Sequence, residues 1–222
     1  MKTALIFGAN GLTGKACLMQ LLNNHNYHSV LIAVRAPIAL QHPKFKQQVI
    51  NFNNIEQYAQ LFNVDEIFCC LGTTIKKAKS KGNFARIDYQ LVKDIAQLAC
   101  AAKVKRFLVI SSLGANANSK SFYSATKGKM EMAVKTFNIA QCYVFRPSLL
   151  LGEREEFRLA ERMSALLFKL IGFIFIGPLA AFKPIKAADV AKAMITVANQ
   201  PNDGAAFTVI ENQKIQAIAN SS

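Results

Sequence analysis

Three glycines, at positions 8, 11 and 14, separate a short apolar run from a segment with helical periodicity near the start of the chain. Residues 4–7 form the apolar run, and residues 12–22 repeat apolar side chains every three to four positions. A glycine turn between a strand and a helix brings bare backbone and free helical N–H groups close to a pyrophosphate. A glycine string alone is a weak signal, because glycines also end strands, but its place after the first strand favours dinucleotide binding.

The rest of the chain alternates between the two kinds of segment. Apolar runs predict further strands at residues 29–34, 48–52, 66–71, 106–110, 141–145 and 206–210, and helical spacing predicts helices at 83–102, 123–137 and 187–199. Most of the runs are uninterrupted, as is typical of parallel strands that helices cover on both faces. The pattern therefore predicts an α/β fold, a Rossmann-type doubly wound parallel sheet.

Domain organisation follows from length and composition. At 222 residues and 52% hydrophobic, without a linker, repeat or low-complexity tract, the chain is expected to be a single domain spanning residues 1–222. Residues 148–185 are expected to form a small C-terminal lobe, the substrate-side or lid segment. Within it, residues 163–182 are almost wholly apolar, and a stretch of about 20 residues just spans a bilayer. Lys169 and Pro178 inside this stretch favour a buried or lid helix, although attachment to a membrane surface stays open.

The charge of the chain bears on its partners. The formal net charge is +14 and no acidic residue precedes Glu56, so the surface should attract anions such as phosphates, nucleic acid or anionic lipid. The densest cluster, residues 76–81, has no aromatic side chains on which bases could stack, and it is interpreted as a solvated loop. We therefore do not expect nucleic-acid binding, whereas a peripheral membrane contact stays open.

The N-terminus and the cysteines predict a cytoplasmic location. The chain reaches Gly8 too soon for the apolar region of a signal peptide. Its five cysteines are odd in number and lack CxxC spacing, which is typical of reduced, buried thiols. The three histidines have no cysteine or carboxylate at ligand spacing, so no metal site is expected.

Arg35 bears on the choice of cofactor. The second predicted strand ends at Val34 and Arg35, where folds that prefer NAD carry an acidic residue that holds the ribose 2′-hydroxyl. An arginine suits the 2′-phosphate of NADP(H) instead. The alternative is that Arg35 is an ordinary surface cation.

Three side chains are candidates for chemistry. Tyr123 and Lys127 are four residues apart and so share one face of a helix. A phenol ionises only near pH 10, and a neighbouring cation such as Lys127 would stabilise the phenolate. Ser111 and Ser112 follow the fifth predicted strand, at the edge where ligands of open α/β sheets bind. One hydroxyl there could bind a substrate carbonyl, and the alternative is a merely polar strand end or a helix cap.

With these residues in hand, the chain resembles the short-chain dehydrogenase/reductase superfamily, and most closely its atypical branch of Tat-interacting-protein-like NAD(P)-binding oxidoreductases. The resemblance covers nearly the whole length. The segments that carry it are residues 4–14, 70–74, 110–115, 123–131 and 146–154.

The resemblance implies roles for individual residues. Tyr123 would be the proton donor or acceptor, Lys127 would bind the nicotinamide ribose, and Ser112, ahead of Ser111, would orient the carbonyl. Pro147 would lie near the nicotinamide amide, and Gly72 with Thr73 along the adenosine side. The implied catalytic residues are Ser112, Tyr123 and Lys127, and the implied cofactor-binding residues are Gly8, Asn10, Gly11, Leu12, Thr13, Gly14, Arg35, Asn51, Phe52, Leu71, Gly72, Thr73, Ser111, Tyr123, Lys127, Arg146 and Pro147.

The chain also departs from the pattern of this superfamily. Asn51 stands where an aspartate often contacts adenine, and Ser148 replaces a common glycine. Asp88 stands where many members place a catalytic asparagine. The expected function is an NADP(H)-dependent oxidoreductase that acts on a small carbonyl or alcohol substrate. The identity of the substrate and the oligomeric state of the protein stay open. The alternatives are a non-catalytic NADP(H) sensor and a peripheral membrane or nucleic-acid binder.

Overall fold

The computed structural model describes residues 1–152, 181–201 and 204–221. Seven of its strands form one sheet in the order β3-β2-β1-β4-β5-β6-β9, and all pairs are parallel. They are β1 (Lys2–Phe7), β2 (Tyr27–Val34), β3 (Phe45–Val49), β4 (Glu66–Cys69), β5 (Arg106–Ile110), β6 (Gln141–Arg146) and β9 (Phe207–Glu211). The order reverses between β1 and β4, so the carboxyl ends of these two strands border the crevice where such sheets bind ligands. The predicted Rossmann-type fold is confirmed.

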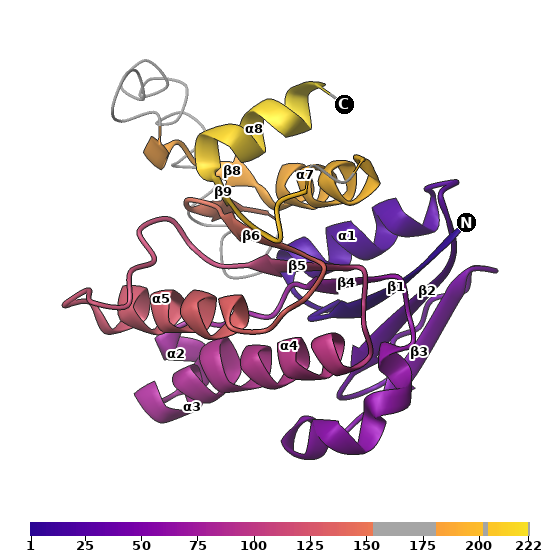
Figure 1. Ribbon diagram of the computed structural model, residues 1–222, viewed down its shortest axis with the longest axis horizontal. Helices are drawn as coiled ribbons and strands as arrows, with labels where there is room; N and C mark the ends of the chain where they lie inside the picture. Colours follow the sequence, from indigo (N-terminus) through magenta and orange to yellow (C-terminus); the bar gives the residue numbers. More distant parts are fainter. Residues whose placement is uncertain (153–180, 202–203, 222) are drawn as a thin grey trace.

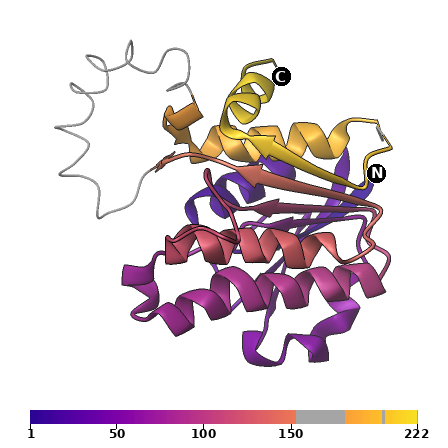
Figure 2. The same cartoon turned by 60° about the vertical axis from the view of Figure 1, so that its left-hand side comes forward.

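Helices cover both faces of this sheet (Figure 1, Figure 2). One face packs against α1 (Leu12–Leu22), α7 (Ala187–Asn199) and α8 (Asn212–Ser221). The other packs against η1 (Phe52–Phe62), α4 (Leu91–Ala101) and α5 (Phe122–Lys135), with α2 (Ile75–Ala78), α3 (Lys81–Ala85) and η2 (Arg86–Gln90) preceding α4. A small parallel pair, β7 (Leu150–Leu151) with β8 (Ile185–Lys186), lies apart from the sheet.

Strand alternation explains the uninterrupted apolar runs. In β1, Ala4 and Ile6 belong to the core under α1 and α7, whereas Leu5 and Phe7 belong to the core under α4. All four side chains are buried, so both faces of a central strand need apolar residues. At about 25 cal/mol per Å² of apolar surface, the side chains of Leu5, Ile6 and Phe7 each contribute about 1.5 to 3 kcal/mol when they leave water.

Several predicted segments differ in the structure. The third strand is Phe45–Val49 rather than residues 48–52, and its largely exposed side chains explain why an apolar run misplaced it. Residues 83–102 are not one α-helix, because α3 passes through the π-helical turn η2 into α4. The C-terminal helix α8 was not expected.

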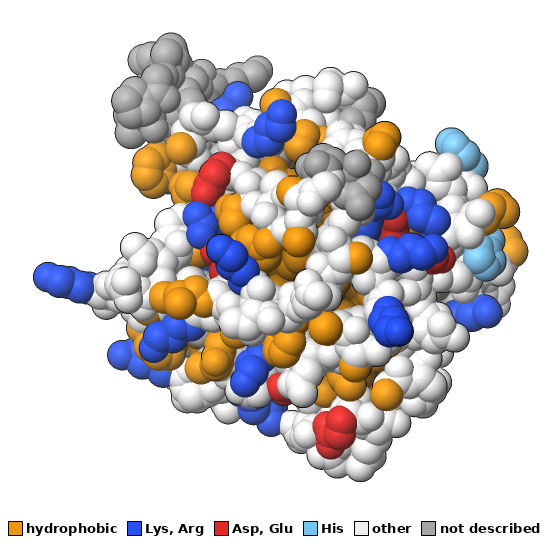
Figure 3. All heavy atoms as spheres, in the orientation of Figure 1, with side chains coloured by type: hydrophobic (Ala, Val, Ile, Leu, Met, Phe, Trp, Pro, Cys, Tyr) orange, Lys and Arg blue, Asp and Glu red, His pale blue; other side chains and the backbone are white. Residues whose placement is uncertain are grey.

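The basic cluster is helical rather than a loop. Thr74 caps α2 by accepting a hydrogen bond from the Lys77 N–H at 3.2 Å, and Ser80 caps α3 in the same way through Asn83 at 3.0 Å. Lys79, with φ of 64°, ends α2 in the left-handed conformation. Figure 3 shows Lys and Arg side chains spread over the face in view, with few acidic ones between them.

A polar network lies at the amino ends of the strands. Glu66, 1% exposed, accepts hydrogen bonds from Lys2 Nζ at 2.8 Å and from Tyr27 Oη at 2.5 Å. The Arg106 guanidinium contacts the same carboxylate at 3.1 Å and donates to the Ala198 carbonyl at the end of α7 at 2.7 Å. A buried carboxylate with three donors is fully compensated, so this network fixes four strands and one helix at that edge.

The neighbouring Asp65 is also held by hydrogen bonds. Burial by itself would raise the pKa of this carboxyl, but hydrogen bonds from Lys105 and from the backbone and hydroxyl of Thr3 outweigh it. The pKa of Asp65 is lowered to about 2.

Candidate functional site

The glycine loop joins β1 to α1 and requires glycine at two of its positions. Gly8 has φ of +80°, and a β-carbon there would lie 2.6 Å from the Cys70 carbonyl oxygen after β4. A β-carbon at Gly14 would overlap the Gly8 carbonyl. These two glycines therefore let the loop close against β4 and let α1 pack directly onto the loop.

Gly11 differs from the other two. Its φ of −80° suits any residue, and a β-carbon would meet the Gly8 carbonyl oxygen at 3.2 Å, with its next neighbour 4.0 Å away. Among the residues that the structure describes, no other atom outside its own helix turn lies within 4 Å of that position. Gly11 is the N-cap of α1 without a side-chain cap, and the first turn carries no acidic residue. In the described part of the chain the buried Thr13 hydroxyl has no hydrogen-bond partner. An anion at this helix start would meet free N–H groups and no competing carboxylate.

The two serines after β5 differ in their surroundings. Ser111 is buried on the α5 side and donates to the Glu131 carboxylate at 2.5 Å. Ser112 is also buried, at 9% exposed, and its hydroxyl has no partner among the described residues. A buried hydroxyl without a partner is costly unless a ligand satisfies it. Ser112 is thus the serine available to a ligand, in keeping with its place ahead of Ser111 in the sequence analysis.

Lys127 lies on α5 beside the end of β4. Its ammonium forms an ion pair with Asp88 Oδ1 at 2.7 Å, and both side chains are almost fully buried. A β-carbon at Gly72 would lie 3.9 Å from Lys127 Nζ. Gly8 approaches the backbone of Cys70, and Gly72, two residues after Cys70, lies next to the Lys127 ammonium. The glycine loop and the lysine share one edge of the sheet.

Tyr123 lies one turn before Lys127 on the first turn of α5, and its side chain is half-buried. Its ring packs against Phe84 of α3, with 5.4 Å between the ring centroids. Ser121 caps α5 by accepting from the Ser124 N–H at 3.4 Å. The cap fixes the residue at which α5 begins, and the aromatic contact fixes the position of the Tyr123 ring.

The expected adenosine-side residues lie at the ends of β2, β3 and β4. Arg35 follows β2 and is exposed, and Thr73 follows β4 with its N–H donating to Asp88 Oδ2 at 2.9 Å. Asn51 is exposed and caps η1 by accepting from the Asn53 N–H at 3.0 Å. Phe52 is half-buried, with its ring 6.5 Å from that of Phe7. Three further expected residues are Asn10, exposed, and Leu12 and Leu71, half-buried.

Arg146 is held by two carboxylates. Its guanidinium donates to both oxygens of Glu131, at 2.9 and 2.5 Å, and to Glu211 at 2.8 Å. The hydrogen bonds from the guanidinium to Glu131, and then to Glu211, raise the pKa of Arg146 above its usual value. The arginine thus ties β6 to α5 and β9, a role that sequence reasoning missed. The assignment of Arg146 to the cofactor-binding set stays a prediction, and the neighbouring Pro147 is buried at the end of β6.

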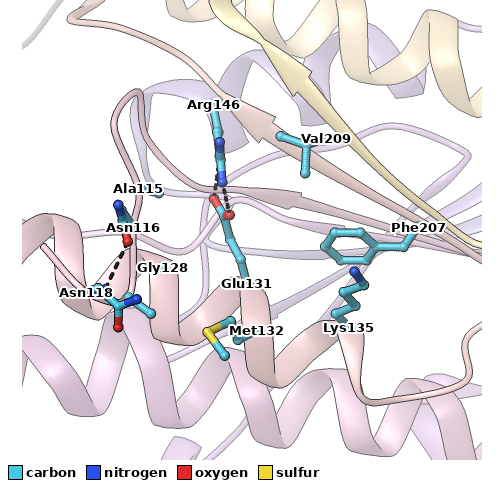
Figure 4. Close-up of a pocket in the computed structure, with 11 residues that line it drawn as sticks. Ala115, Asn116, Asn118, Gly128, Glu131, Met132, Lys135, Arg146, Phe207 and Val209 are labelled. Atoms are coloured by element: carbon cyan, nitrogen blue, oxygen red, sulfur yellow. Dashed lines mark hydrogen bonds and ion pairs between the residues drawn. The ribbon is translucent and has the colours of Figure 1, made fainter.

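A cleft of about 380 Å³ opens between α5 and β9, next to this arginine (Figure 4). Its floor is Phe207 and Val209, and Met132 and Lys135 of α5 form one wall. Neither Ser112, Tyr123 nor Lys127 lines it. The cleft is therefore separate from the expected catalytic residues.

The cysteines are free, and four of the five are buried, as expected; Cys100 is half-buried. Burial raises the pKa of the Cys69 and Cys142 thiols to about 12. Within residues 1–152, 181–201 and 204–221, no group of three His, Cys, Asp or Glu side chains is placed to hold a metal ion.

Comparison with known proteins adds to this geometry. Residues 8–149 match the model of a family described as NAD(P)H-binding. Protein HTATIP2 of Rattus norvegicus is 31% identical over the whole of this chain and 90% of its own length. Protein FMP52, mitochondrial, of Debaryomyces hansenii is 26% identical over 99% of both chains. The resemblance stated from the sequence motifs is confirmed.

Two solved structures share the fold at low sequence identity. The Bordetella bronchiseptica enzyme WbmH in complex with NAD⁺ superposes with a TM-score of 0.71 at 14% identity, covering 95% of this chain and 75% of that chain. MoeE5 in complex with UDP-glucose and NAD has a TM-score of 0.68 at 16% identity, covering 99% and 81%. At such identities the likeness concerns the fold alone.

The expected location of the protein is wrong. The cytoplasmic location inferred from the N-terminus and the cysteines is contradicted by the yeast relatives, several of which are named as mitochondrial proteins. Reduced, buried thiols do not distinguish between compartments inside the cell. None of the helices in the described ranges is long and apolar enough to cross a membrane, and residues 163–182 lie largely outside those ranges.

Proposed function

This chain belongs to the family of NAD(P)H-binding proteins, and from that premise we propose that it is an NADP(H)-dependent oxidoreductase of a small carbonyl or alcohol substrate. The observation that carries the proposal is the shared edge of the sheet. There the bare backbone at Gly11, the unpartnered Ser112 hydroxyl and the buried Lys127 ammonium all lie at the carboxyl ends of strands.

The residues present fit a dinucleotide. Gly11 and the first turn of α1 would hold the pyrophosphate. The glycine leaves the backbone bare, whereas a side chain at this position would take up space that the pyrophosphate needs. Arg35 would pair with the 2′-phosphate of NADP(H). Lys127 would bind the nicotinamide ribose, and Gly72 with Thr73 would lie along the adenosine side. When bound, the nicotinamide would supply or accept a hydride.

The remaining chemistry falls to this chain's own side chains. The Ser112 hydroxyl would donate to the substrate oxygen and so satisfy its own unpaired group. Tyr123 would pass a proton to or from that oxygen. Lys127, one turn along α5, would stabilise the phenolate form of the tyrosine. The ion pair with Asp88 would reduce this stabilisation, because the carboxylate compensates part of the positive charge of the lysine.

Cofactor preference is tested by titrating NADPH and NADH into wild type and Arg35→Ala. We expect wild type to bind NADPH more tightly, and Arg35→Ala to weaken NADPH by about 1.5 to 3 kcal/mol with little change for NADH, the scale of a hydrogen bond between charged groups. Lys46→Ala removes an exposed cation from the neighbouring strand β3 and is the matched control. Equal losses for both cofactors in Arg35→Ala would show that the arginine reads no 2′-phosphate.

Catalysis is tested with a panel of carbonyl compounds followed by NADPH absorbance. On the best substrate, Tyr123→Phe should lower kcat by about 10² to 10⁴ and leave NADPH affinity near wild type, because only the proton donor is lost. Tyr143→Phe, which removes a hydroxyl that accepts from Gln141 within β6, should keep the wild-type rate. NADPH binding without turnover on any compound, or full activity in Tyr123→Phe, would refute the enzyme and support a cofactor sensor.

A further inference from the structure

Asp88 connects two parts of the candidate site that are far apart in the sequence. Its side chain is fully buried, at 0% exposed. Oδ1 contacts the Lys127 ammonium on α5 at 2.7 Å, and Oδ2 accepts the backbone N–H of Thr73 after β4 at 2.9 Å. Each carboxylate oxygen thus serves a different element. Gly72 lies against both groups, since a β-carbon there would be 3.7 Å from Asp88 Oδ1 and 3.9 Å from Lys127 Nζ.

The backbone that carries Asp88 is unusual. The residue lies in the π-helical turn η2 (Arg86–Gln90), which interrupts an otherwise α-helical segment between α3 and α4. Such single π turns are rare and frequently occur at functional sites. The same segment holds the start of α5 through Phe84, whose ring packs on Tyr123. Side chains from α3 and η2 therefore contact both Tyr123 and Lys127.

The burial of these charges couples the contacts. A carboxylate taken out of water is tolerated only when its partners compensate it, and removal of one partner leaves an uncompensated buried charge. Asp88 keeps its position because Lys127 and the Thr73 N–H both hold it. Loss of the lysine would drive the carboxylate toward water and so release Thr73. An amide at this position is uncharged and has one oxygen, so it cannot form the ion pair with Lys127 through one oxygen and accept from Thr73 through the other.

We propose that Asp88 is a positioning residue that joins Lys127 on α5 to the turn at Gly72 and Thr73, so that the two sides of the cofactor crevice are ordered together. The inference rests on the proposed function only for the identity of the cofactor. The link between the lysine and the turn is a property of the ligand-free protein and is open to a separate test.

The ligand-free test measures amide hydrogen exchange by NMR in the full chain. The exchange rate of Thr73 is compared with that of Val109, a buried residue of β5 that reports global opening. In Lys127→Met and in Asp88→Asn, Thr73 should exchange at least tenfold faster relative to Val109, and the double variant should add nothing further. Dividing by the Val109 rate removes any effect of simple destabilisation. Unchanged Thr73 exchange in both single variants, or additive effects, would overturn the link.

The second test measures NADPH affinity by fluorescence titration of the same variants. Asp88→Asn and Lys127→Met should each raise the Kd for NADPH about tenfold. The Kd of the double variant should equal that of the single variant that binds NADPH more weakly, because Asp88 acts through the lysine. Asp65→Asn is the matched control, since this aspartate also binds a lysine and a backbone N–H but lies at the opposite edge of the sheet. Its Kd should match wild type.

The two tests separate the two proposals. Wild-type NADPH affinity in a folded Asp88→Asn variant would overturn the positioning role. If wild type binds no nicotinamide dinucleotide, the proposed function fails, and the exchange of Thr73 still decides whether Asp88 joins the lysine to the turn.

Discussion

Replacement of Gly11 by valine should abolish dinucleotide binding and leave the fold intact. The structure separates this glycine from its two neighbours. Gly11 has φ of −80° and ψ of 168°, an extended conformation that β-branched residues adopt readily. Its added β-carbon would lie 3.2 Å from the Gly8 carbonyl oxygen, so the loop must yield by a few tenths of an ångström. In the proposed complex the pyrophosphate would lie against this bare backbone, so the valine side chain would compete with it for space.

The cost to folding is correspondingly small. Valine is a poor N-cap compared with glycine, which costs about 1 kcal/mol, and the tight contact adds a similar amount. A total of about 2 kcal/mol lowers Tm by roughly 4 to 8 °C for a chain of this size and leaves a typical protein folded. Gly14→Ala is the contrasting variant. Its β-carbon would overlap the Gly8 carbonyl, and backbone cannot move aside cheaply, so the loss should exceed 3 kcal/mol.

Circular dichroism melts and calorimetric titration with NADPH measure both quantities. We expect Gly11→Val to melt cooperatively within 10 °C of wild type and to bind NADPH at least 100-fold more weakly. Normal NADPH affinity in Gly11→Val would mean that the loop is only a turn. A Gly14→Ala protein as stable as Gly11→Val would mean that the contacts used in this estimate do not describe the loop.

Three further predictions concern stability and reactivity. Glu66→Ala should lower the free energy of unfolding in urea by about 3 to 5 kcal/mol, because Lys2, Arg106 and Tyr27 lose their buried partner; a loss below 1 kcal/mol would contradict the network. The lowered pKa of Asp65, about 2 against an unfolded value near 3.8, means that its contribution is complete above about pH 5 and is lost as the pH falls through 3.8 and below 2. Asp65→Asn should flatten this part of the profile of stability against pH, and an unchanged slope would refute the assignment. With a thiol reagent, Cys100 should react before the four buried cysteines, whose modification should await unfolding, as peptide mass mapping can show.

Most strands of the sheet could be predicted from the sequence, because a strand that is buried on both faces needs an uninterrupted run of apolar residues. The exception is β3 at the sheet edge, whose only apolar residues are Phe45 and the exposed Val49 at its two ends. Helix α8 escaped because its polar sequence offers only Ile215, Ile218 and Ala219 to the core. The π-helical turn at Asp88 has no periodicity of its own, so residues 83–102 read as one helix.

The candidate site was predictable as far as local patterns reach. The glycine loop and the Tyr123 and Lys127 pair each lie within seven residues of sequence. Contacts across the fold carry no such signal. Lys127 meets Asp88 across 39 positions, and Arg146 meets Glu131 and Glu211 only because β6 lies between α5 and β9. For this reason local sequence patterns did not reveal that Arg146 also ties β6 to α5 and β9.

The carboxylate of Glu66 lies at the opposite end of the strands from Gly8, Gly72 and Ser112. The contacts that clamp the strands together are thus remote from the loops that meet ligands, and the two sets share no side chain. Such an arrangement gives the loops freedom to diverge, since an exchange of residues around Ser112 or Gly72 leaves the clamp in place. For engineering, it directs stabilising substitutions to the amino ends of the strands and substitutions that alter substrate choice to the carboxyl ends, with little expected interaction between the two.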